Sequence, residues 1–360
     1  MSDKNAFVTG MAVPLVEVWR GPIVESVHHG HLAAVDGAGE TVTELGAPET
    51  VTYFRSSSKA FQAIPVVASG AADRFGFTEK EIALACGSHS GEPMHVETAK
   101  SILSKIGMDE SALKCGAHEP FNAEVARELI RTGQEPSVLQ NNCSGKHAAM
   151  LGLAKHLGAP TDRYYEWDNP VQQAVAKVIS EFCETPLDEL KIGVDGCGVP
   201  VFGLPVRAMA LGYARLISPE DRFDTATRDA CGRIVNAMIT FPQMIGGSKD
   251  RLDTELIKAG KGRLISKIGA EGVYTVGVLP CAEWPKGLGL ALKIGDGDDR
   301  RARPPAVIEA LRQLNVLGED DLSALSEYAP IPITNRRHEL VGEVRAAFTL
   351  NIKARDNQSS

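Results

Sequence analysis

Apolar positions near the start of the chain fall in β-rich runs. One run extends from Ala12 to Trp19 and another from Ile23 to Val35, and Arg20-Gly21-Pro22 between them has the residues of a turn. The pattern predicts an N-terminal β-hairpin. From Ser56 onward the spacing of apolar positions changes to that of helices.

Capping residues mark helix boundaries in the middle of the chain. Thr78 and Glu81 form a capping box before the apolar run 82–85, and Asp168-Asn169-Pro170 supplies a cap and then a proline at the first helical position. Further helices are expected at 93–106, 122–132 and 144–157. A long helical segment therefore follows the hairpin.

Strand patterns return late in the chain, with one more helix between them. These elements are expected at 263–267, 272–279, 288–294, 304–314 (the helix) and 340–350. A hairpin that pairs with C-terminal strands predicts an α+β fold, with an antiparallel sheet built from both chain ends and a helical insertion domain. We expect the sheet domain at 1–55 and 260–352, the mostly helical domain at 56–259 with a cleft between the two, and a frayed tail at 353–360.

The composition is that of a globular protein large enough to be an enzyme. The chain has 360 residues, of which 43% are apolar and 23% charged, without low-complexity bias. Acidic residues outnumber basic ones, 46 to 38, and the basic residues are scattered, which argues against a nucleic-acid partner. No stretch of about 18 apolar residues occurs, so no membrane span is expected.

The N-terminal sequence and the number of cysteines favour a cytoplasmic protein. The first residues lack a basic region, an unbroken apolar region and a cleavage site, so no export signal is expected. The seven cysteines are odd in number and sparse, which argues against a disulfide framework. Gly193, Gly196 and Gly198 form no dinucleotide fingerprint, because Val199-Pro200 takes the place of the expected helix, and no nucleotide cofactor is implied.

The first candidate for chemistry is the segment Arg55-Ser56-Ser57-Ser58-Lys59. On a helix Ser56 and Lys59 share one face, and a lysine activates a serine when burial or a neighbouring cation such as Arg55 lowers the lysine pKa. A lone Ser-x-x-Lys is more often a serine-rich helix cap with an exposed lysine. By itself the motif is weak evidence.

Two later segments strengthen the catalytic interpretation. Cys86-Gly87-Ser88-His89-Ser90-Gly91-Glu92 is a polar loop between helical segments, and Lys267-Ile268-Gly269 ends a late strand. Ser-x-x-Lys, a polar serine loop and Lys-x-Gly in this order match the motif layout of the serine β-lactamase and penicillin-binding-protein fold. The loop and strand motifs depart from the Ser-Asp-Asn and Lys-Thr-Gly of those enzymes, which argues against a penicillin-recognising protein.

A third candidate site involves two cysteines. Cys143 and Lys146 lie in the run Gln140 to His147, and Asp195 and Cys197 follow farther along the chain. Two thiolates with an adjacent Asp or Lys would bind a zinc ion, but a second Cys-x-x-Cys half is missing. Spacing alone favours two buried cysteines and a glycine-rich turn.

Together the segments resemble the L-asparaginases of the Rhizobium etli type, the asparaginase II family, which have a serine β-lactamase-like fold. The resemblance covers nearly the whole chain, from Pro14 to Leu350. Its carriers are Tyr53-Phe54-Arg55-Ser56-Ser57-Ser58-Lys59, Ser88-His89-Ser90-Gly91-Glu92, Asn142-Cys143-Ser144-Gly145-Lys146-His147, Asp195-Gly196-Cys197-Gly198 and Lys267-Ile268-Gly269.

The resemblance implies two Ser-Lys tandems that face one substrate, Ser56 with Lys59 and Ser88 with Lys267. We expect Ser56 to attack the side-chain amide of L-asparagine with Lys59 as general base, and ammonia to leave. Ser88 and Lys267 would relay a proton to the leaving nitrogen before water releases aspartate from the acyl-enzyme. Which serine is acylated first stays open, because each has a lysine partner.

The resemblance also implies a zinc ion and a homodimer. Cys143, Lys146 and Cys197 match the zinc ligands, and the zinc is expected to position substrate rather than to activate water. Lysine binds a metal only when neutral, so metal occupancy should fall as the pH drops. The residues assigned to substrate binding, partly from charge matching, are Arg55, Asp195 and His147.

Two kinds of alternative function remain. One is another acyl-transfer hydrolase of the same fold, such as a glutaminase, a D-amino-acid peptidase or an esterase. The other is a non-enzymatic protein that binds zinc or a small ligand. Both Ser-Lys pairs argue against the second alternative, because a binding protein needs no activated nucleophile.

Overall fold

The structure, a computed structural model, describes residues 11–353 and divides into two compact units. Unit 1 consists of Met1–Thr52, Leu204–Ser218 and Gly269–Ser360, and unit 2 of Tyr53–Gly203 and Pro219–Ile268. Unit 2 holds every residue to which the sequence assigns a catalytic, substrate-binding or zinc-binding role. From residue 354 onward the expected tail lies outside the described residues.

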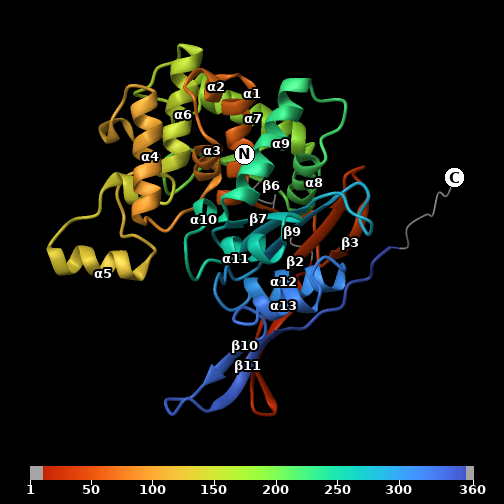
Figure 1. The fold of residues 1–360 in the computed structure, drawn as a ribbon. Helices are drawn as coiled ribbons and strands as arrows, with labels where there is room; N and C mark the ends of the chain where they lie inside the picture. Colours follow the sequence, from red (N-terminus) through yellow and green to blue (C-terminus); the bar gives the residue numbers. More distant parts are fainter. Residues whose placement is uncertain (1–10, 354–360) are drawn as a thin grey trace, which may run out of the picture. The chain divides into compact units, whose positions relative to one another are not determined.

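Unit 1 is an antiparallel sheet that joins strands from both ends of the chain (Figure 1). Its strands are β1 (Val13–Arg20), β2 (Ile23–Asp36), β3 (Thr41–Leu45), β8 (Val273–Val278), β9 (Leu288–Ile294), β10 (Ile331–Thr334) and β11 (Leu340–Ala346). β1 lies between its hairpin partner β2 and the C-terminal β11, so Val18 faces Ser26 on one side and Val344 on the other. The predicted α+β class, with a sheet built from both chain ends, is confirmed.

One helix lies in a different unit from the one the sequence suggested. The helices of unit 1 are α8 (Val206–Ile217), α12 (Arg303–Gln313) and α13 (Glu319–Ala324). α8 packs against β2, β8 and β9, and Gly289 permits this approach because a Cβ there would lie 1.9 Å from the carbonyl oxygen of Ala210. The sequence placed 204–218 in the helical domain, but the almost wholly buried α8 belongs with the sheet.

Unit 2 is a helical body arranged around α1. Its helices are α1 (Lys59–Ala68), α2 (Ala71–Arg74), α3 (Glu79–Cys86), α4 (Pro93–Lys105), α5 (Ala123–Thr132), α6 (Ser144–Leu157), α7 (Pro170–Cys183), α9 (Thr225–Thr240), α10 (Pro242–Ile245) and α11 (Leu252–Ala259). α1 packs against α3, α6, α7 and α9, and it buries its own first residue, Lys59. The amine of that lysine is thereby removed from bulk water.

Shorter elements complete the two units. The 3₁₀ helices are η1 (Arg55–Ser58), η2 (Glu110–Ala112) and η3 (Val138–Gln140), and the remaining strands are β4 (Val51–Tyr53), β5 (Lys191–Val194), β6 (Pro200–Pro205) and β7 (Leu264–Gly269). β7 is buried along almost all of its length and carries Lys267. Residues 260–268, which the sequence placed with the sheet domain, belong to unit 2.

Helices in unit 2 begin where the capping residues predict. Glu81 N donates to Thr78 Oγ1 at 3.3 Å and Thr78 N donates to Glu81 Oε2 at 2.6 Å, so the capping box before α3 is confirmed. Asn169 caps α7 by accepting from Val171 N at 3.0 Å. No helix in the described part of the chain is both long and apolar enough to cross a membrane.

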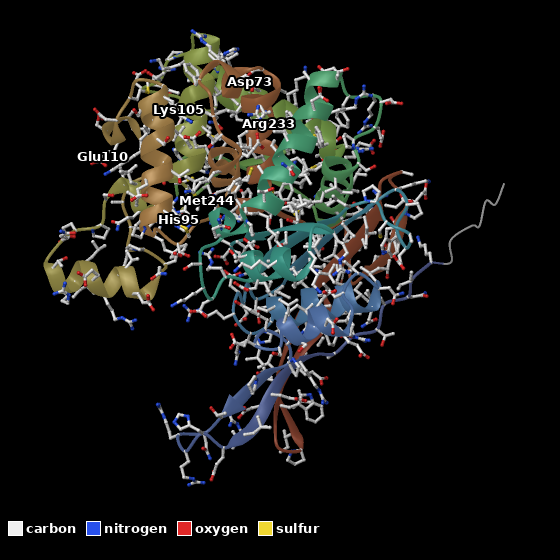
Figure 2. All side chains as sticks on the ribbon, in the orientation of Figure 1. Asp73, His95, Lys105, Glu110, Arg233 and Met244 are labelled. Carbon is white, nitrogen blue, oxygen red and sulfur yellow. The ribbon has the colours of Figure 1, made fainter. Side chains whose placement is uncertain are left out.

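An ion pair on α9 links this helix to the start of the helical unit. Arg233 donates to Asp73 and to Glu79, each at 2.7 Å, and Figure 2 shows Arg233 directed at Asp73. Asp73 is largely exposed, so the contact adds at most about 1 kcal/mol to the free energy of unfolding. The ion pair therefore contributes little to the stability of this unit.

Candidate functional site

The serine-rich segment before α1 forms a strained turn. Arg55 has a φ of 52°, in the left-handed region that non-glycine residues seldom adopt. Ser57 Oγ donates to the carbonyl of Lys267 at 2.9 Å, and Ser58 Oγ donates to the carbonyl of Arg55 at 2.8 Å. Both of these serines are buried, whereas Ser56 is half-buried. Of the three, Ser56 is the one that a substrate can reach.

Lys59 is held by three oxygen atoms. Its Nζ lies 2.5 Å from the carbonyl oxygen of Gly87, 3.0 Å from Ser88 Oγ and 3.2 Å from the carbonyl oxygen of Asn142. The lysine is 1% exposed, and this burial lowers its pKa because the charged form loses its hydration. An amine with a lowered pKa is suited to accept a proton from a serine.

The loop that carries Ser88 is fixed by its backbone. Ser88 N donates to the carbonyl of Ile245 at 2.8 Å. A Cβ on Gly87 would lie 2.3 Å from the carbonyl oxygen of Met244, so this close approach requires a glycine. Ser88 is therefore held at a defined position against α10.

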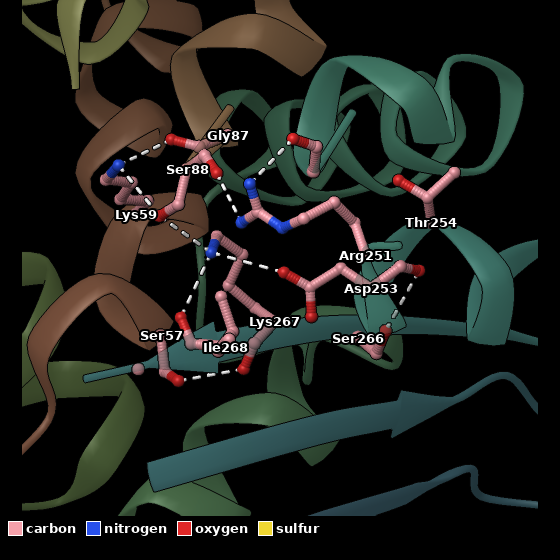
Figure 3. Close-up of polar contacts among 12 residues, drawn as sticks. Ser57, Lys59, Gly87, Ser88, Arg251, Asp253, Thr254, Ser266, Lys267 and Ile268 are labelled. Carbon is pink, nitrogen blue, oxygen red and sulfur yellow. Dashed lines mark hydrogen bonds and ion pairs between the residues drawn. The ribbon is translucent and has the colours of Figure 1, made fainter. Parts of the chain in front are cut away.

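Lys267 approaches the same serine from β7. Its Nζ lies 3.0 Å from Ser88 Oγ, 3.0 Å from the carbonyl oxygen of Ile268 and 3.5 Å from Asp253 Oδ2 (Figure 3). Burial lowers the pKa of Lys267 to about 7, with Asp253 acting in the opposite direction and the cations of Lys59 and Arg251 acting with it. Near neutral pH this amine is therefore able to give or take a proton.

Ser88 thus stands between two buried amines. The sequence paired Ser88 with Lys267, and the structure places the two in hydrogen-bonding distance. It also brings Lys59 to Ser88, whereas the hydrogen bonds found among the described residues include none between Lys59 and the Ser56 side chain. The two tandems that the sequence treated as separate pairs share Ser88.

Arg55 and Asp195 meet, although they are far apart in sequence. Arg55 Nε donates to Asp195 Oδ1 at 3.0 Å, and both side chains are partly buried. Burial alone would raise the pKa of Asp195, but the cations of Lys146 and Arg55 lower it, so the carboxylate is charged at neutral pH. A guanidinium and a carboxylate side by side provide partners for both charged groups of an α-amino acid.

The predicted zinc ligands are close together and buried. Lys146 Nζ donates to Cys197 Sγ at 2.9 Å. A hydrogen bond from Cys143 and the charge of Lys146 lower the pKa of Cys197 to about 5, whereas the same hydrogen bond and burial raise that of Cys143 to about 12. Burial lowers the pKa of Lys146, but the neighbouring Cys197 thiolate, with Cys143 and Asp195, raises it above its usual value.

A thiolate, a thiol and an amine within reach of one another fit the preference of zinc for sulfur and nitrogen donors. Lys146 is essential to such a site, because no cluster of three or more His, Cys, Asp and Glu side chains in residues 11–353 is arranged to hold a metal. The donor set fits zinc only if Lys146 releases its proton.

His147 lies apart from any accessible surface. The side chain is fully buried, its Nδ1 is 2.6 Å from the hydroxyl of Tyr164, and burial lowers the pKa of His147 to about 3. It is therefore neutral at physiological pH. This placement gives no support to the expected contact between His147 and substrate.

Sequence reasoning missed two residues that support the site. Arg251 donates to the carbonyl of Ser88 at 2.7 Å and to Ser90 Oγ at 2.8 Å, and Asp253 contacts Lys267. Both lie where α11 begins. The sequence signal at this position is an acidic residue in the first turn of a helix. Such a residue predicts that the helix is stabilised and does not predict a role in catalysis.

A serine hydroxyl within hydrogen-bonding distance of two buried amines is an arrangement in which lysine, rather than histidine, can exchange a proton with serine. A sequence model of the L-asparaginase II family matches residues 16–346, and the chain therefore belongs to this family. The family confirms the resemblance and makes the protein an amidohydrolase. No curated protein matches the chain.

Several solved structures are similar to the chain at low sequence identity. A probable glutaminase from Bacillus subtilis in complex with 6-diazo-5-oxo-L-norleucine is 13% identical, with 80% of this chain and 85% of that chain covered and a TM-score of 0.38. A β-lactamase from Burkholderia ambifaria is 17% identical, with 79% and 92% covered and a TM-score of 0.37. A Bacillus glutaminase in 4.3 M NaCl is 14% identical, with 86% and 93% covered and a TM-score of 0.38.

Proposed function

We propose that this amidohydrolase converts L-asparagine to L-aspartate and ammonia through an acyl-enzyme. The family supports amide hydrolysis, and the observation that carries the mechanism is the chain of contacts from Lys59 Nζ through Ser88 Oγ to Lys267 Nζ, each 3.0 Å long. Two amines with lowered pKa on one hydroxyl form a path for protons.

Ser56 is the nucleophile in this proposal. Ser57 and Ser58 donate their hydroxyls to backbone carbonyls, and Ser88 is 3% exposed between its lysines, whereas Ser56 is half-buried. Ser56 Oγ attacks the side-chain carbonyl carbon of asparagine as its proton passes to Lys59, three residues along the same helical turn. The product of this step is a tetrahedral adduct.

Ser88 completes the first half-reaction by passing a proton to the leaving nitrogen. As the carbon–nitrogen bond breaks, the nitrogen takes the hydroxyl proton of Ser88, and Lys267 replaces it. The proton that Lys59 took from Ser56 then passes through Ser88 to Lys267, so that Lys59 is neutral again. Ammonia leaves and an aspartyl ester on Ser56 remains. Water then attacks this ester, giving its proton to Lys59, and aspartate is released as Ser56 regains its hydroxyl proton.

The charged end of the substrate would be bound by Arg55 and Asp195. The guanidinium suits the α-carboxylate and the carboxylate suits the α-ammonium. Arg55 and Asp195 form an ion pair with each other at 3.0 Å. The α-carboxylate and α-ammonium of the substrate would therefore replace the contact between these two side chains. An amino acid with both charged groups is thus preferred over a simple amide.

We also propose that zinc binds to Cys143, Lys146 and Cys197. All three side chains are buried and Lys146 already contacts Cys197. The ion would supply a fixed positive charge next to Asp195, and this charge would help to orient the substrate. No step of the acyl transfer above depends on it.

The test is ammonia release from L-asparagine and, separately, L-glutamine by the purified protein, with and without added zinc. Release from asparagine with little from glutamine is expected. Release from glutamine alone would replace this proposal by a glutaminase, and release from neither, with saturable binding of asparagine, would favour a non-enzymatic role. The Ser56→Ala variant controls for contaminating activity.

A further inference from the structure

Asp253 is a buried carboxylate whose single polar contact in the described chain is a lysine of the site. The residue is 2% exposed, and its Oδ2 lies 3.5 Å from Lys267 Nζ. Its other oxygen, Oδ1, is buried and has no hydrogen-bond partner among the described residues. A buried carboxylate with an unsatisfied oxygen is costly to fold, so its position calls for a functional reason.

The groups that face Lys267 are mostly cationic or neutral. Lys59 approaches from α1, Arg251 from the segment before α11, and Cys86 from α3. Burial raises the pKa of Cys86 to about 12, so its thiol is neutral. Asp253 is therefore the one anion among these four groups, and it alone favours a positive charge on Lys267.

The contacts of Lys267 suit an ammonium ion, because, unlike the three oxygen contacts of Lys59 described above, they include a carboxylate. Lys267 Nζ is within reach of Ser88 Oγ, the Ile268 carbonyl and Asp253 Oδ2, and the last two are acceptors only. An ammonium has three donors for these three oxygens. With Lys267 as donor, Ser88 Oγ receives a hydrogen bond and becomes a better proton source for a group on its other side.

We propose that Asp253 is a positioning residue that holds Lys267 as an ammonium directed at Ser88. Its role in turnover rests on the proposed function, because Ser88 needs a donor behind it when it gives its proton to the departing nitrogen. In that step the Ser88 O–H bond breaks, the ammonia N–H bond forms, and one Lys267 N–H proton replaces the lost one. Lys267 then becomes an ammonium again by taking the proton of Lys59 through Ser88, which leaves Lys59 neutral for the second half-reaction.

Arg251 and Asp253, two residues apart at the start of α11, contact the two members of the Ser88–Lys267 pair. Arg251 holds the backbone of Ser88, and two residues later Asp253 holds the side chain of Lys267. The start of α11 therefore supports both partners of the pair (Figure 3). A displacement of this segment would move serine and lysine together.

The experiment compares wild type with Asp253→Asn, which keeps the shape and removes the charge. Loss of the anion lowers the pKa of Lys267, so the ammonium disappears at lower pH. The alkaline limb of the kcat/KM profile for L-asparagine should move to lower pH by about one unit or more, the usual effect of a charge partner at this range. Asp253→Glu should restore the limb toward its wild-type position.

A matched control is Asp321→Asn, which removes another buried carboxylate, one that accepts from Gly318 N in unit 1. This control should leave the alkaline limb in place. If Asp253→Asn does not fold, Asp253→Ser is the second neutral variant and the same shift is expected. An unchanged limb in a folded neutral variant would overturn the proposal.

A second readout is independent of substrate. The lysine ¹³Cε resonances of uniformly ¹³C-labelled protein are followed from pH 5 to 11, and Lys267→Met assigns the Lys267 signal. Its midpoint should fall in Asp253→Asn. If asparagine is not hydrolysed but this midpoint falls, the positioning role stands and the proposed function fails; if the midpoint stays, the positioning role fails even when turnover is normal.

Discussion

Lys267 Nζ and Ser88 Oγ lie 3.0 Å apart, although their positions are separated by 179 residues in the chain. Lys59 reaches the same oxygen from the opposite end of the site. Ser88 is thereby the meeting point of two amines whose pKa values are both lowered by burial. The predictions below follow from this arrangement and from the groups around it.

Replacement of Ser56 by alanine should abolish acyl transfer. Because the proposed nucleophile is lost while the lysines remain, kcat should fall by roughly 10³-fold or more. Steady-state ammonia release measures the loss, and mass spectrometry of acid-quenched enzyme with asparagine should show an adduct in wild type only. Ser69→Ala, at the other end of α1, is the control. An adduct that persists in Ser56→Ala would transfer the nucleophile to another serine.

Replacement of Ser88 by alanine should slow turnover without abolishing substrate binding. The path between Lys59 and Lys267 is interrupted, and the leaving nitrogen loses its proton donor, so kcat should fall by about 10²- to 10⁴-fold with a small change in KM. Initial rates over a range of asparagine concentrations separate the two parameters. A variant with wild-type kcat would show that Ser88 is not on the proton path.

Stability should depend on pH through Lys267. The pKa of Lys267 is about 7 in the folded protein and 10.5 without the fold, so between these values the unfolded chain binds more protons. The free energy of unfolding contributed by this group therefore rises with pH from about 7 to 10.5. Denaturant titrations at several pH values should show a smaller upward slope in Lys267→Met. Equal slopes in the two proteins would contradict the lowered pKa.

Two variants of Arg55 should separate the effect of backbone strain on stability from the effect of the guanidinium charge on substrate binding. The φ of 52° strains any residue with a Cβ, so Arg55→Gly should be more stable than Arg55→Ala by about 1 kcal/mol in denaturant unfolding. Both variants lack the guanidinium, and both should show KM for asparagine raised by about tenfold or more, the usual loss of a charge-assisted contact. An unchanged KM in Arg55→Ala would remove this residue from substrate binding.

Zinc content should depend on the two cysteines of the proposed site. Cys143→Ser and Cys197→Ser should each bind substantially less zinc than wild type when dialysed protein is measured by elemental analysis. Cys231→Ser, a buried cysteine of α9, is the control and should retain the wild-type zinc content. Occupancy should also fall as the pH drops, because protons compete for Lys146 and the thiolates. Equal zinc in all three variants would exclude this site.

Much of the local structure could be predicted from the sequence, because the interactions that define it span a few residues. The capping box of Thr78 and Glu81, the Asn169-Pro170 helix start and the turn at Gly21 are made by neighbours along the chain. The motif blocks also carried the family, which the match over 16–346 confirms. The cytoplasmic location and the homodimer stay predictions.

Tertiary structure decided how these pieces combine. α8 joined the sheet because its apolar surface covers β2, β8 and β9, which no helical pattern reveals. Lys59 and Lys267 share Ser88, and Asp253 faces Lys267, because segments from distant parts of the chain are packed into one buried volume. Burial and charge proximity set the pKa values there, and both quantities exist only once the chain is folded. The sequence determined which residue types are available for chemistry, and the fold determined which of them touch.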